Sequence, residues 1–319
     1  MARRRRRRKI FRKAPIIITI LLILAVSAFL LYNYGEKWFG ISFFETEETG
    51  GTTQAPGDEV QFHFIDVGQG DAILITTKDG NMLIDAGDLS SGSQKKLDSY
   101  LKSQNIESFK YVVFTHTDAD HIGSGDIILN NYEVGTVIMP DYQATSKVYG
   151  RVVAAIEKHE IDLVLIGEDK DCEKPGYTFK LGPITHTVMA PTKDFDDPNE
   201  MSVVIKSVYG ETSVLLTGDA EIKSEKAMLM EYTDGELDID ILKAGHHGSS
   251  SSSSHSFLTA TTPEITIISC GEGNKYGHPH EVVMDRLEKA EIEIYRTDLQ
   301  GTIIVKTDGV TYTVETQNK

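Results

Sequence analysis

The chain has 319 residues, and 32 Lys and Arg against 48 Asp and Glu give a formal net charge of −16. Residues 1–13 carry nine basic residues and no acidic ones, so the remaining residues hold a charge of −25, which argues against a protein that coats nucleic acid through lysine and arginine. With 40% hydrophobic and 25% charged residues and two cysteines, the composition is globular and excludes collagen-like, disordered and Cys-rich zinc-module chains.

An uncharged apolar segment, Pro15 to Tyr34, follows the basic residues. Roughly twenty helical residues at about 1.5 Å each span the hydrocarbon core of a bilayer, which is about 30 Å thick. We therefore expect a cytoplasmic tail over 1–13 and a single transmembrane anchor over 14–34, because basic residues stay on the cytoplasmic side. The rest of the chain would be extracellular, held at the cell membrane. Cleavage of the segment as a signal peptide, near 26–28, is the alternative.

Residues 35–58 include a stretch rich in Thr, Gly and Glu without apolar periodicity, which predicts a solvated linker. Residues 59–319 read as one large domain with mixed sheets and outer helices. The first three strands should form an antiparallel meander, with Gly68 and Gly70 making a tight hairpin. Strands are expected over 60–67, 71–77, 81–87, 111–116, 136–140, 162–167, 184–191, 202–210, 212–219, 238–245, 264–270, 291–297, 301–309 and 310–316. Helices are expected over 93–103, 145–160, 221–231 and 281–289, with a short one near His255.

The segment Thr115-His116-Thr117-Asp118-Ala119-Asp120-His121 follows an apolar strand and is dense in potential metal ligands. Histidine supplies imidazole nitrogen and aspartate supplies hard oxygen, which are groups that bind divalent cations. In α/β folds, side chains at the ends of neighbouring strands converge on one crevice. Ligand-type residues follow other strands as well: Asp219, His246, His247, His278 and His280. Together these residues predict a polynuclear metal site.

The segment HTDADH (116–121) resembles the HxHxDH signature of the metallo-β-lactamase superfamily, with Asp118 where the second histidine usually stands. That variant resembles the metallo-β-lactamase domain of ComEC-type competence proteins. Further segments carry the same resemblance: FIDVGQGDAILI (64–75), LIDAG (83–87), NEMSVVI (199–205), LLTGD (215–219), KAGHHGSSSS (243–252), YGHPH (276–280) and YRTDLQGTI (295–303). The resemblance covers nearly all of residues 60–307. It implies an α/β (α+β) fold, the four-layer αββα sandwich, with the site at one edge between the two sheets.

The resemblance also implies which residues hold the metals. His116 and Asp118 would bind the first ion, and Asp120 and His121 would bind the second. Asp219 would bridge the two ions. His247 is expected to complete the second site, with His246 as the alternative.

Other residues would support these ligands. Asp85 would orient the HTDADH loop, and Asp71 would brace the site. The histidine usual in the third motif of the superfamily is absent, because the stretch reads MAPTKDFDDPNEMS (189–202). Asp197, Asn199 or Ser202 would take its place, unless the first site is weak.

The expected chemistry is metal-assisted hydrolysis with one or two divalent ions. Two cations about 3.5–4 Å apart would lower the pKa of a shared water and leave a metal-bound hydroxide near neutral pH. Asp120 or Asp219 could take the proton, and His278 could act as a general acid or contact a phosphate. An oxygen-rich first site favours Mn²⁺ without excluding Zn²⁺. Candidate contacts for a substrate phosphate are Ser249, Ser250 and Arg296; the alternatives are a flexible Ser-rich loop and a plain surface charge.

We therefore expect a membrane-anchored extracellular hydrolase that cleaves phosphodiesters, with nucleic acid as the substrate that the resemblance implies. One alternative is a hydrolase of a cell-envelope phosphodiester or a small ester. Another is a metal-stabilised binding domain without catalysis, although the presence of His121, Asp219 and the pair His246-His247 argues against it. The expected partners are the membrane and the phosphodiester substrate.

Overall fold

The computed structural model describes residues 59–318, which lie in a compact unit of residues 56–319. The predicted cytoplasmic tail (1–13), transmembrane anchor (14–34) and linker (35–58) fall outside these residues. Among the helices of residues 59–318, none is long and apolar enough to cross a bilayer.

One sheet has eight strands in the order β15-β14-β1-β2-β3-β4-β5-β6. Its strands are β1 (Val60–Phe64), β2 (Ile73–Thr77), β3 (Gly80–Ile84), β4 (Ser108–Val113), β5 (Glu133–Pro140), β6 (Asp162–Ile166), β14 (Ile303–Thr307) and β15 (Tyr312–Thr316). The pairs from β15 to β3 are antiparallel, which confirms the predicted meander. The pairs from β3 to β6 are parallel. The sheet is therefore mixed, as expected of a meander that is followed by crossover helices.

The second sheet has seven strands in the order β13-β12-β11-β10-β9-β8-β7. Its strands are β7 (Thr178–Leu181), β8 (Ile184–Ala190), β9 (Val204–Tyr209), β10 (Thr212–Leu216), β11 (Ile241–Lys243), β12 (Ile265–Ile268) and β13 (Glu293–Arg296). Here the pairs from β7 to β10 are antiparallel and those from β10 to β13 are parallel. In both sheets, parallel strands lead directly into the segments with ligand-type residues: β4 ends at Val113, β10 at Leu216 and β11 at Lys243.

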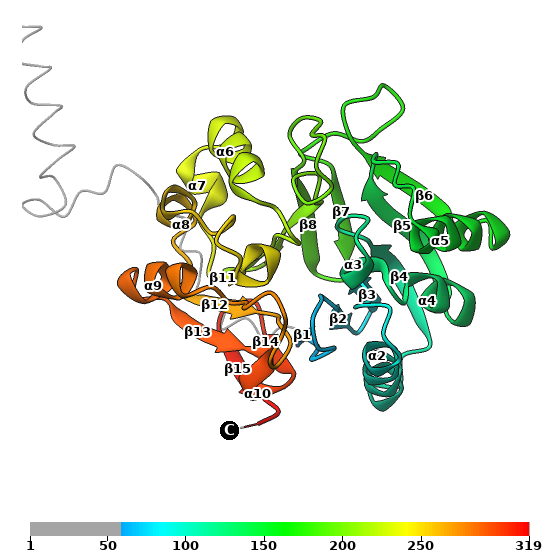
Figure 1. Cartoon of the computed structure of the whole chain (residues 1–319), viewed down its shortest axis with the longest axis horizontal. Helices are drawn as coiled ribbons and strands as arrows, with labels where there is room; N and C mark the ends of the chain where they lie inside the picture. The colour runs from blue at the N-terminus through cyan, green and yellow to red at the C-terminus, as the bar shows by residue number, and fades with distance from the viewer. Residues whose placement is uncertain (1–58, 319) are drawn as a thin grey trace, which may run out of the picture. The chain divides into compact units, whose positions relative to one another are not determined.

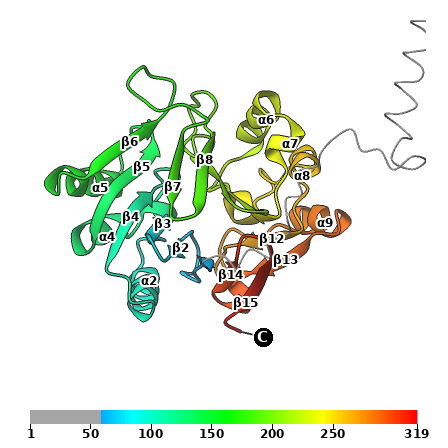
Figure 2. The ribbon, with the colours of Figure 1, turned by 180° about the vertical axis from the view of Figure 1, so that it is seen from behind.

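Helices cover the outer face of each sheet, so the domain has four layers (Figure 1; the same layers are seen from behind in Figure 2). On the eight-stranded sheet lie α2 (Ser91–Ser103), α4 (Gly125–Asn131) and α5 (Lys147–Lys158). On the seven-stranded sheet lie α6 (Ile222–Glu231), α7 (Asp234–Leu237), α8 (His255–Thr261) and α9 (Glu281–Lys289). The short helices are α3 (Ala119–Ile122), η1 (Gly245–Gly248) and α10 (Thr297–Gln300). The inner core lies between the sheets, where Phe62 and Phe64 of one sheet pack in the same cluster as Ile205 and Ile241 of the other.

The predicted sandwich is confirmed, but two local expectations differ. Gly68 and Gly70 do not form a tight hairpin, because Ile65 pairs with Ala72 and six residues loop out between them. Strand β7 was not expected: its four residues alternate between exposed and buried, a run too short to mark a strand by pattern.

Candidate metal centre

The loop after β4 and the short helix α3 carry the predicted ligands of the HTDADH segment. Asp118 is the N-cap of α3, and Asp120 and His121 lie in its first turn. The loop 65–72 braces this turn, since the backbone N–H of Asp71 donates to the carbonyl of Asp120 at 3.2 Å. Gly70 makes that approach feasible: with φ +129°, a Cβ here would lie 2.3 Å from the Asp120 carbonyl oxygen.

Four side chains converge on one buried point. His121 Nε2 and His247 Nε2 are 3.3 Å apart. His247 Nε2 is 3.4 Å from Asp120 Oδ2. Asp219 contributes both oxygens, with Oδ1 3.1 Å from His121 Nε2 and Oδ2 3.6 Å from His247 Nε2. The structure thus brings together the residues predicted for the second ion, and His247 contacts each of the other three.

Hydrogen bonds on the far side of each imidazole fix which nitrogen faces this point. His121 Nδ1 donates to Asp85 Oδ2 at 2.7 Å, and His247 Nδ1 donates to the Ser269 carbonyl at 2.9 Å. Because Nδ1 carries the proton, Nε2 has a lone pair directed at the cluster. Asp85 also accepts from the backbone N–H and hydroxyl of Thr115, at 2.8 and 2.7 Å. It therefore orients the HTDADH loop, the role predicted for it.

The residues proposed for a first ion are arranged more loosely. His116 is fully buried, and its Nε2 lies 4.0 Å from Asp219 Oδ2. Asp118 is exposed at the rim. Its carboxyl group is nevertheless partly shielded from water, which raises its pKa, and the negative charge of Asp120 raises that pKa further.

Buried polar atoms without partners test whether a cation fits here. His116 Nε2 and Asp219 Oδ1 are both buried and accept no hydrogen bond. A buried acceptor without a donor costs free energy, about 1–3 kcal/mol, which a divalent cation between them would remove. Asp71, His121, Asp219 and His247 each offer a ligand atom within 4.8 Å of the others. The donor set of imidazole and carboxylate groups matches that of divalent-metal sites, so the residues fit a divalent ion.

The electrostatics of the cluster lead to the same conclusion. Burial would lower the pKa of His247, but Asp219, Asp120 and Asp71 outweigh it and raise that pKa to about 10. Burial would likewise lower the pKa of His121, and Asp219 and Asp85 instead raise it well above its usual value. The carboxylates therefore require positive charge at this point, supplied by protons on the imidazoles or by a metal ion that displaces them.

Asp71 was predicted to brace the site, and its partner Lys243 was not identified from the sequence. Lys243 Nζ and Asp71 Oδ2 form an ion pair of 2.8 Å, and both side chains are almost completely buried. Asp71 Oδ1 lies 3.4 Å from His247 Nδ1, on the side of the ring that faces away from the cluster. Asp71 therefore belongs to the support of His247. A signal was available in the sequence: Lys243 ends a fully buried strand immediately before Ala244 and the two histidines.

His246 has a different environment from its neighbour. Its Nδ1 lies 2.8 Å from Glu221 Oε1, and its Nε2 lies 3.6 Å from Asp219 Oδ2. It is partly exposed, with a side chain that is 24% accessible. His246 therefore lies between Glu221 and Asp219, and of the two adjacent histidines it is His247 that lies in the cluster with His121 and Asp120.

The predicted substrate contacts lie around this centre. His278 is buried, 6.1 Å from His247 between ring centroids, and its Nδ1 has no partner. Burial and then the charges of His247 and His246 lower its pKa to about 4, which favours a neutral ring that forms hydrogen bonds over a general acid. Arg296 forms an ion pair with Asp298, in which Nη2 of Arg296 lies 2.6 Å from Oδ2 of Asp298.

The Ser-rich loop after the two histidines is fixed in place. Ser250 is exposed and gives its backbone N–H to His280 Nδ1 at 2.8 Å. The Ser249 hydroxyl pairs with that of Ser251 at 2.9 Å. Further along, Glu225 accepts from the backbone of Ser254 at 3.0 Å. The roles of Ser249, Ser250, His278 and Arg296 toward a substrate stay predictions.

The stretch without the third-motif histidine reaches the site through Ser202. The hydroxyl of Ser202 accepts from the backbone N–H of Asp219 at 3.1 Å, so this residue positions Asp219. Asn199 Oδ1 is buried without a partner. Asp197 Oδ1 accepts from the backbone of Asn199 at 3.0 Å. Which of the three would complete a first site stays open.

Comparison with known proteins agrees with this geometry. The family model described as the metallo-beta-lactamase superfamily matches residues 65–272. ComE operon protein 3 of Bacillus subtilis (strain 168) is 29% identical over 262 residues, which cover 77% of this chain and 33% of that protein. Competence protein ComA of Neisseria gonorrhoeae is 29% identical over 249 residues, covering 78% of this chain and 32% of that protein. Recombination protein 2 of Haemophilus influenzae is 33% identical over 249 residues, which cover 77% of this chain and 28% of that protein.

The chain thus spans about a third of the length of the curated relatives it matches. The match confirms the expected likeness to competence proteins. The sandwich fold, the buried Asp and His cluster and the family match agree on a metal-dependent hydrolase fold. The chain belongs to the metallo-β-lactamase superfamily.

Proposed function

We propose that this domain is a metal-dependent phosphodiesterase that hydrolyses nucleic acid. The observation that carries the proposal is the pair of inward-facing Nε2 atoms of His121 and His247, 3.3 Å apart, beside the carboxylates of Asp120 and Asp219. Divalent cations held there would lower the pKa of a bound water and neutralise charge on a phosphoryl oxygen.

The side chains of this chain would supply the remaining chemistry. Asp120 is partly exposed, and its Oδ2 faces His247, so it can accept a proton at the mouth of the site. Asp85 and the Ser269 carbonyl hold the two imidazoles in their tautomers. His278, neutral at pH 7, can donate a hydrogen bond to a substrate oxygen.

Two observations support the choice of a nucleic acid as the substrate to test first. The ligand set contains Asp118 in place of a histidine, which makes it richer in hard oxygen, and oxygen ligands suit Mn²⁺. The relatives include proteins named for competence. A cell-envelope phosphodiester or a small ester would use the same chemistry, so both enter the test as alternative substrates.

The test uses the full chain in mild detergent, stripped of metal by a chelator and reloaded with Mn²⁺ or Zn²⁺. The substrates are bis(p-nitrophenyl) phosphate, linear DNA, RNA and p-nitrophenyl acetate. Metal-dependent cleavage of DNA or RNA is the expected result. Asp120→Ala/His121→Ala should abolish it, whereas Asp162→Ala/His159→Ala, an exposed pair of the same types, should not. Stoichiometric metal with no phosphodiester turnover would refute the proposal.

We further propose that the domain is held outside the cell by the apolar segment 14–34, with the basic residues 1–13 in the cytoplasm. The supports are the length of that segment and the one-sided charge. Protease added to intact cells should release an acidic fragment of the size of the domain. Protection of the fragment until the cells are lysed would contradict this orientation.

A further inference from the structure

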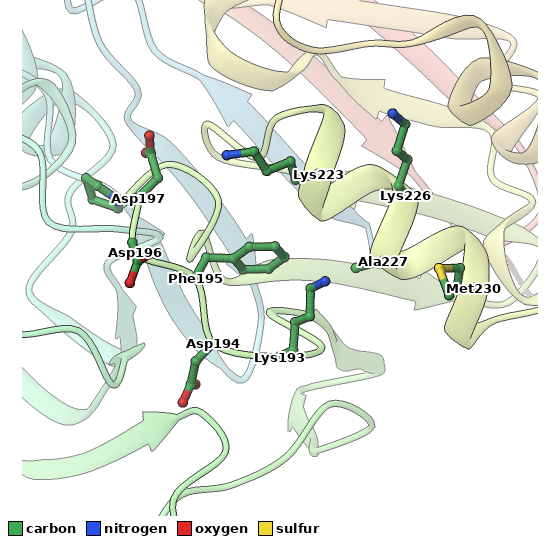
Figure 3. A pocket seen from close by; sticks show the side chains of 10 residues that line it. Lys193, Asp194, Phe195, Asp196, Asp197, Lys223, Lys226, Ala227 and Met230 are labelled. Carbon is green, nitrogen blue, oxygen red and sulfur yellow. The ribbon is translucent and has the colours of Figure 1, made fainter.

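A pocket of about 900 Å³ opens on the surface of the domain (Figure 3). It lies between the loop that joins β8 to β9 and the exposed face of α6. The loop contributes residues 193–198, and the helix contributes Lys223, Lys226, Ala227 and Met230. Asp197 lines it and is also one of the candidates for the first metal site, whereas His121, Asp219 and His247 do not line it.

The pocket combines three lysines with one aromatic ring. Lys193, Lys223 and Lys226 are exposed, and within residues 59–318 none of them forms an ion pair. Lys193 Nζ lies 5.1 Å from the centroid of the Phe195 ring. Other lysines of residues 59–318 do form ion pairs, as Lys96 does with Asp66. The three lysines of the pocket are therefore available to contact the phosphates of an anionic ligand.

The aspartates of the same loop form no ion pair with these lysines within residues 59–318. Asp197 Oδ1 accepts from the backbone of Asn199 at 3.0 Å, and Asp194 Oδ1 accepts from that of Glu168 at 3.4 Å. Figure 3 shows the carboxylates of Asp194 and Asp196 on the side of the loop away from α6, whereas the Phe195 ring points toward the helix. The helix side of the pocket thus presents cations and an aromatic ring.

The same loop connects this pocket to the metal centre. Ser202, near its end, positions Asp219. Glu200 caps the start of α6 by accepting from the backbone N–H groups of Ser224 at 2.6 Å and Lys223 at 3.3 Å. Val203 follows Ser202, and its backbone N–H donates to the Thr115 carbonyl at 2.7 Å, which ties the end of the loop to the residue before His116. The loop therefore joins the pocket at α6 to the residues of the metal centre.

Lysines at intervals suit the phosphates of a polyanion, and an aromatic ring suits the face of a base. Bases in a duplex are stacked on each other, so a base can reach Phe195 only in a single strand. We propose that Phe195, Lys193, Lys223 and Lys226 form a subsite that holds the single-stranded part of a nucleic acid beside the metal centre. This proposal rests on the proposed phosphodiesterase function, and it assigns the subsite that selects the substrate.

The test compares binding and turnover in four forms of the full chain: wild type, Phe195→Leu, Lys223→Gln/Lys226→Gln, and Lys95→Gln/Lys147→Gln as a charge-matched control on exposed lysines. Binding of a fluorescent oligothymidylate is followed by anisotropy in the presence of a chelator, so that it does not depend on catalysis. A DNA hairpin of the same length is the duplex probe, and polyphosphate is the competitor without bases. All four forms carry the same basic N-terminal residues, so differences between them report the pocket.

Phe195→Leu should weaken oligothymidylate binding about tenfold, which corresponds to about 1.4 kcal/mol and lies in the range for stacking one base. It should leave hairpin binding within twofold. The double lysine variant should weaken binding and reduce the slope of log K against log salt by about 1.4, since each phosphate contact on a single strand contributes about 0.7. In both variants, the ratio of kcat/KM for the oligonucleotide to that for bis(p-nitrophenyl) phosphate should fall. The control should match wild type.

The proposal would be overturned if Phe195→Leu bound the oligothymidylate as tightly as wild type does. An equal loss of affinity for the hairpin and for the single strand would overturn it too. Displacement by polyphosphate to the same extent in wild type and Phe195→Leu would show a general polyanion site and overturn it as well. Failure of the proposed function gives a different result: wild-type protein with bound metal would cleave neither the small diester nor the oligonucleotide, whatever its binding of the single strand.

Discussion

His246 and His247 are adjacent, and both have a positive φ, of 47° and 54°. Such a conformation is costly for residues other than glycine, and it is retained where the surrounding structure requires it. Here it turns two consecutive imidazoles toward different partners. His247 faces His121 and Asp120, whereas His246 faces Glu221.

This difference predicts unequal effects of two single substitutions. His247→Ala should remove one ion from the chain or weaken its binding by at least about 10-fold, the lower end of losses seen even for supporting residues. His246→Ala should change the affinity less, because its ring is partly exposed and paired with Glu221. Metal content after dialysis and titration calorimetry measure both. A larger loss of metal affinity for His246→Ala than for His247→Ala would show that His246, and not His247, is the ligand.

The buried pair of Asp71 and Lys243 supports the cluster from behind. Removing one partner leaves an uncompensated buried charge, so Lys243→Met should destabilise the domain by about 3–5 kcal/mol. Asp71→Asn/Lys243→Met should recover part of that loss, since neither charge remains. Urea unfolding of the metal-free chain measures both variants. If the double variant were no more stable than Lys243→Met alone, the ion pair would not be the cause.

At the scale of elements, the loop 65–72 sets the position of α3. Gly70→Ala would place a Cβ 2.3 Å from the Asp120 carbonyl, at φ +129°. We expect a loss of stability of at least about 1–3 kcal/mol, together with weaker metal binding, because Asp120 would be displaced. Gly68→Ala is the matched control: its φ is +88°, and a Cβ there meets nothing within 4 Å. Equal effects of the two substitutions on metal affinity would mean that backbone strain alone explains the change.

The predictable elements were those with a strong local pattern. Residues 73–77 and 81–84 show the expected strands, and the helix expected over 93–103 is α2, starting at Ser91 with Ser90 as its N-cap. The ligand cluster could be predicted because each member follows a strand. The loop at Gly68 and the partner of Asp71 could not, since both depend on contacts between distant segments. Lys243 ends β11 in the second sheet, far along the sequence from Asp71, which precedes β2 in the first sheet. The local pattern of residues therefore carries no information on that pairing.

At the scale of the whole molecule, the acidic charge explains why nucleic acid would be bound locally. The chain outside residues 1–13 holds −25, and two divalent ions would offset only about four of these charges. Long-range attraction of a polyanion is therefore absent. Any affinity has to come from short-range contacts, at the metals and at a few unpaired cations.

The same charge balance predicts how stability depends on pH when the metal is removed. In the folded, metal-free domain the pKa of His247 is raised from 6.5 to about 10. A raised folded-state pKa gives stability that is fully present below pH 6.5 and is lost as the pH rises toward 10. At the acid end, burial alone would raise the pKa of Asp71, but Lys243 and His247 outweigh it and lower that pKa from 3.8 to about 2. The stability that Asp71 contributes is therefore present above pH 3.8 and is lost as the pH falls through 2. The metal-free domain should therefore melt at its highest temperature between about pH 4 and 6.5, with a decline toward pH 10.

Bound metal should reverse the alkaline part of this profile, because the ion replaces the protons on His247 and His121 and binds more tightly as the pH rises. Melting temperatures of the chelator-treated and metal-loaded chain, measured by circular dichroism from pH 5 to pH 10, test this. The gap between the two curves should widen with pH. His247→Gln, which removes the titrating ring, should flatten the decline of the metal-free curve. A metal-free domain that becomes more stable between pH 7 and pH 10 would show that the carboxylates do not hold protons on the imidazoles.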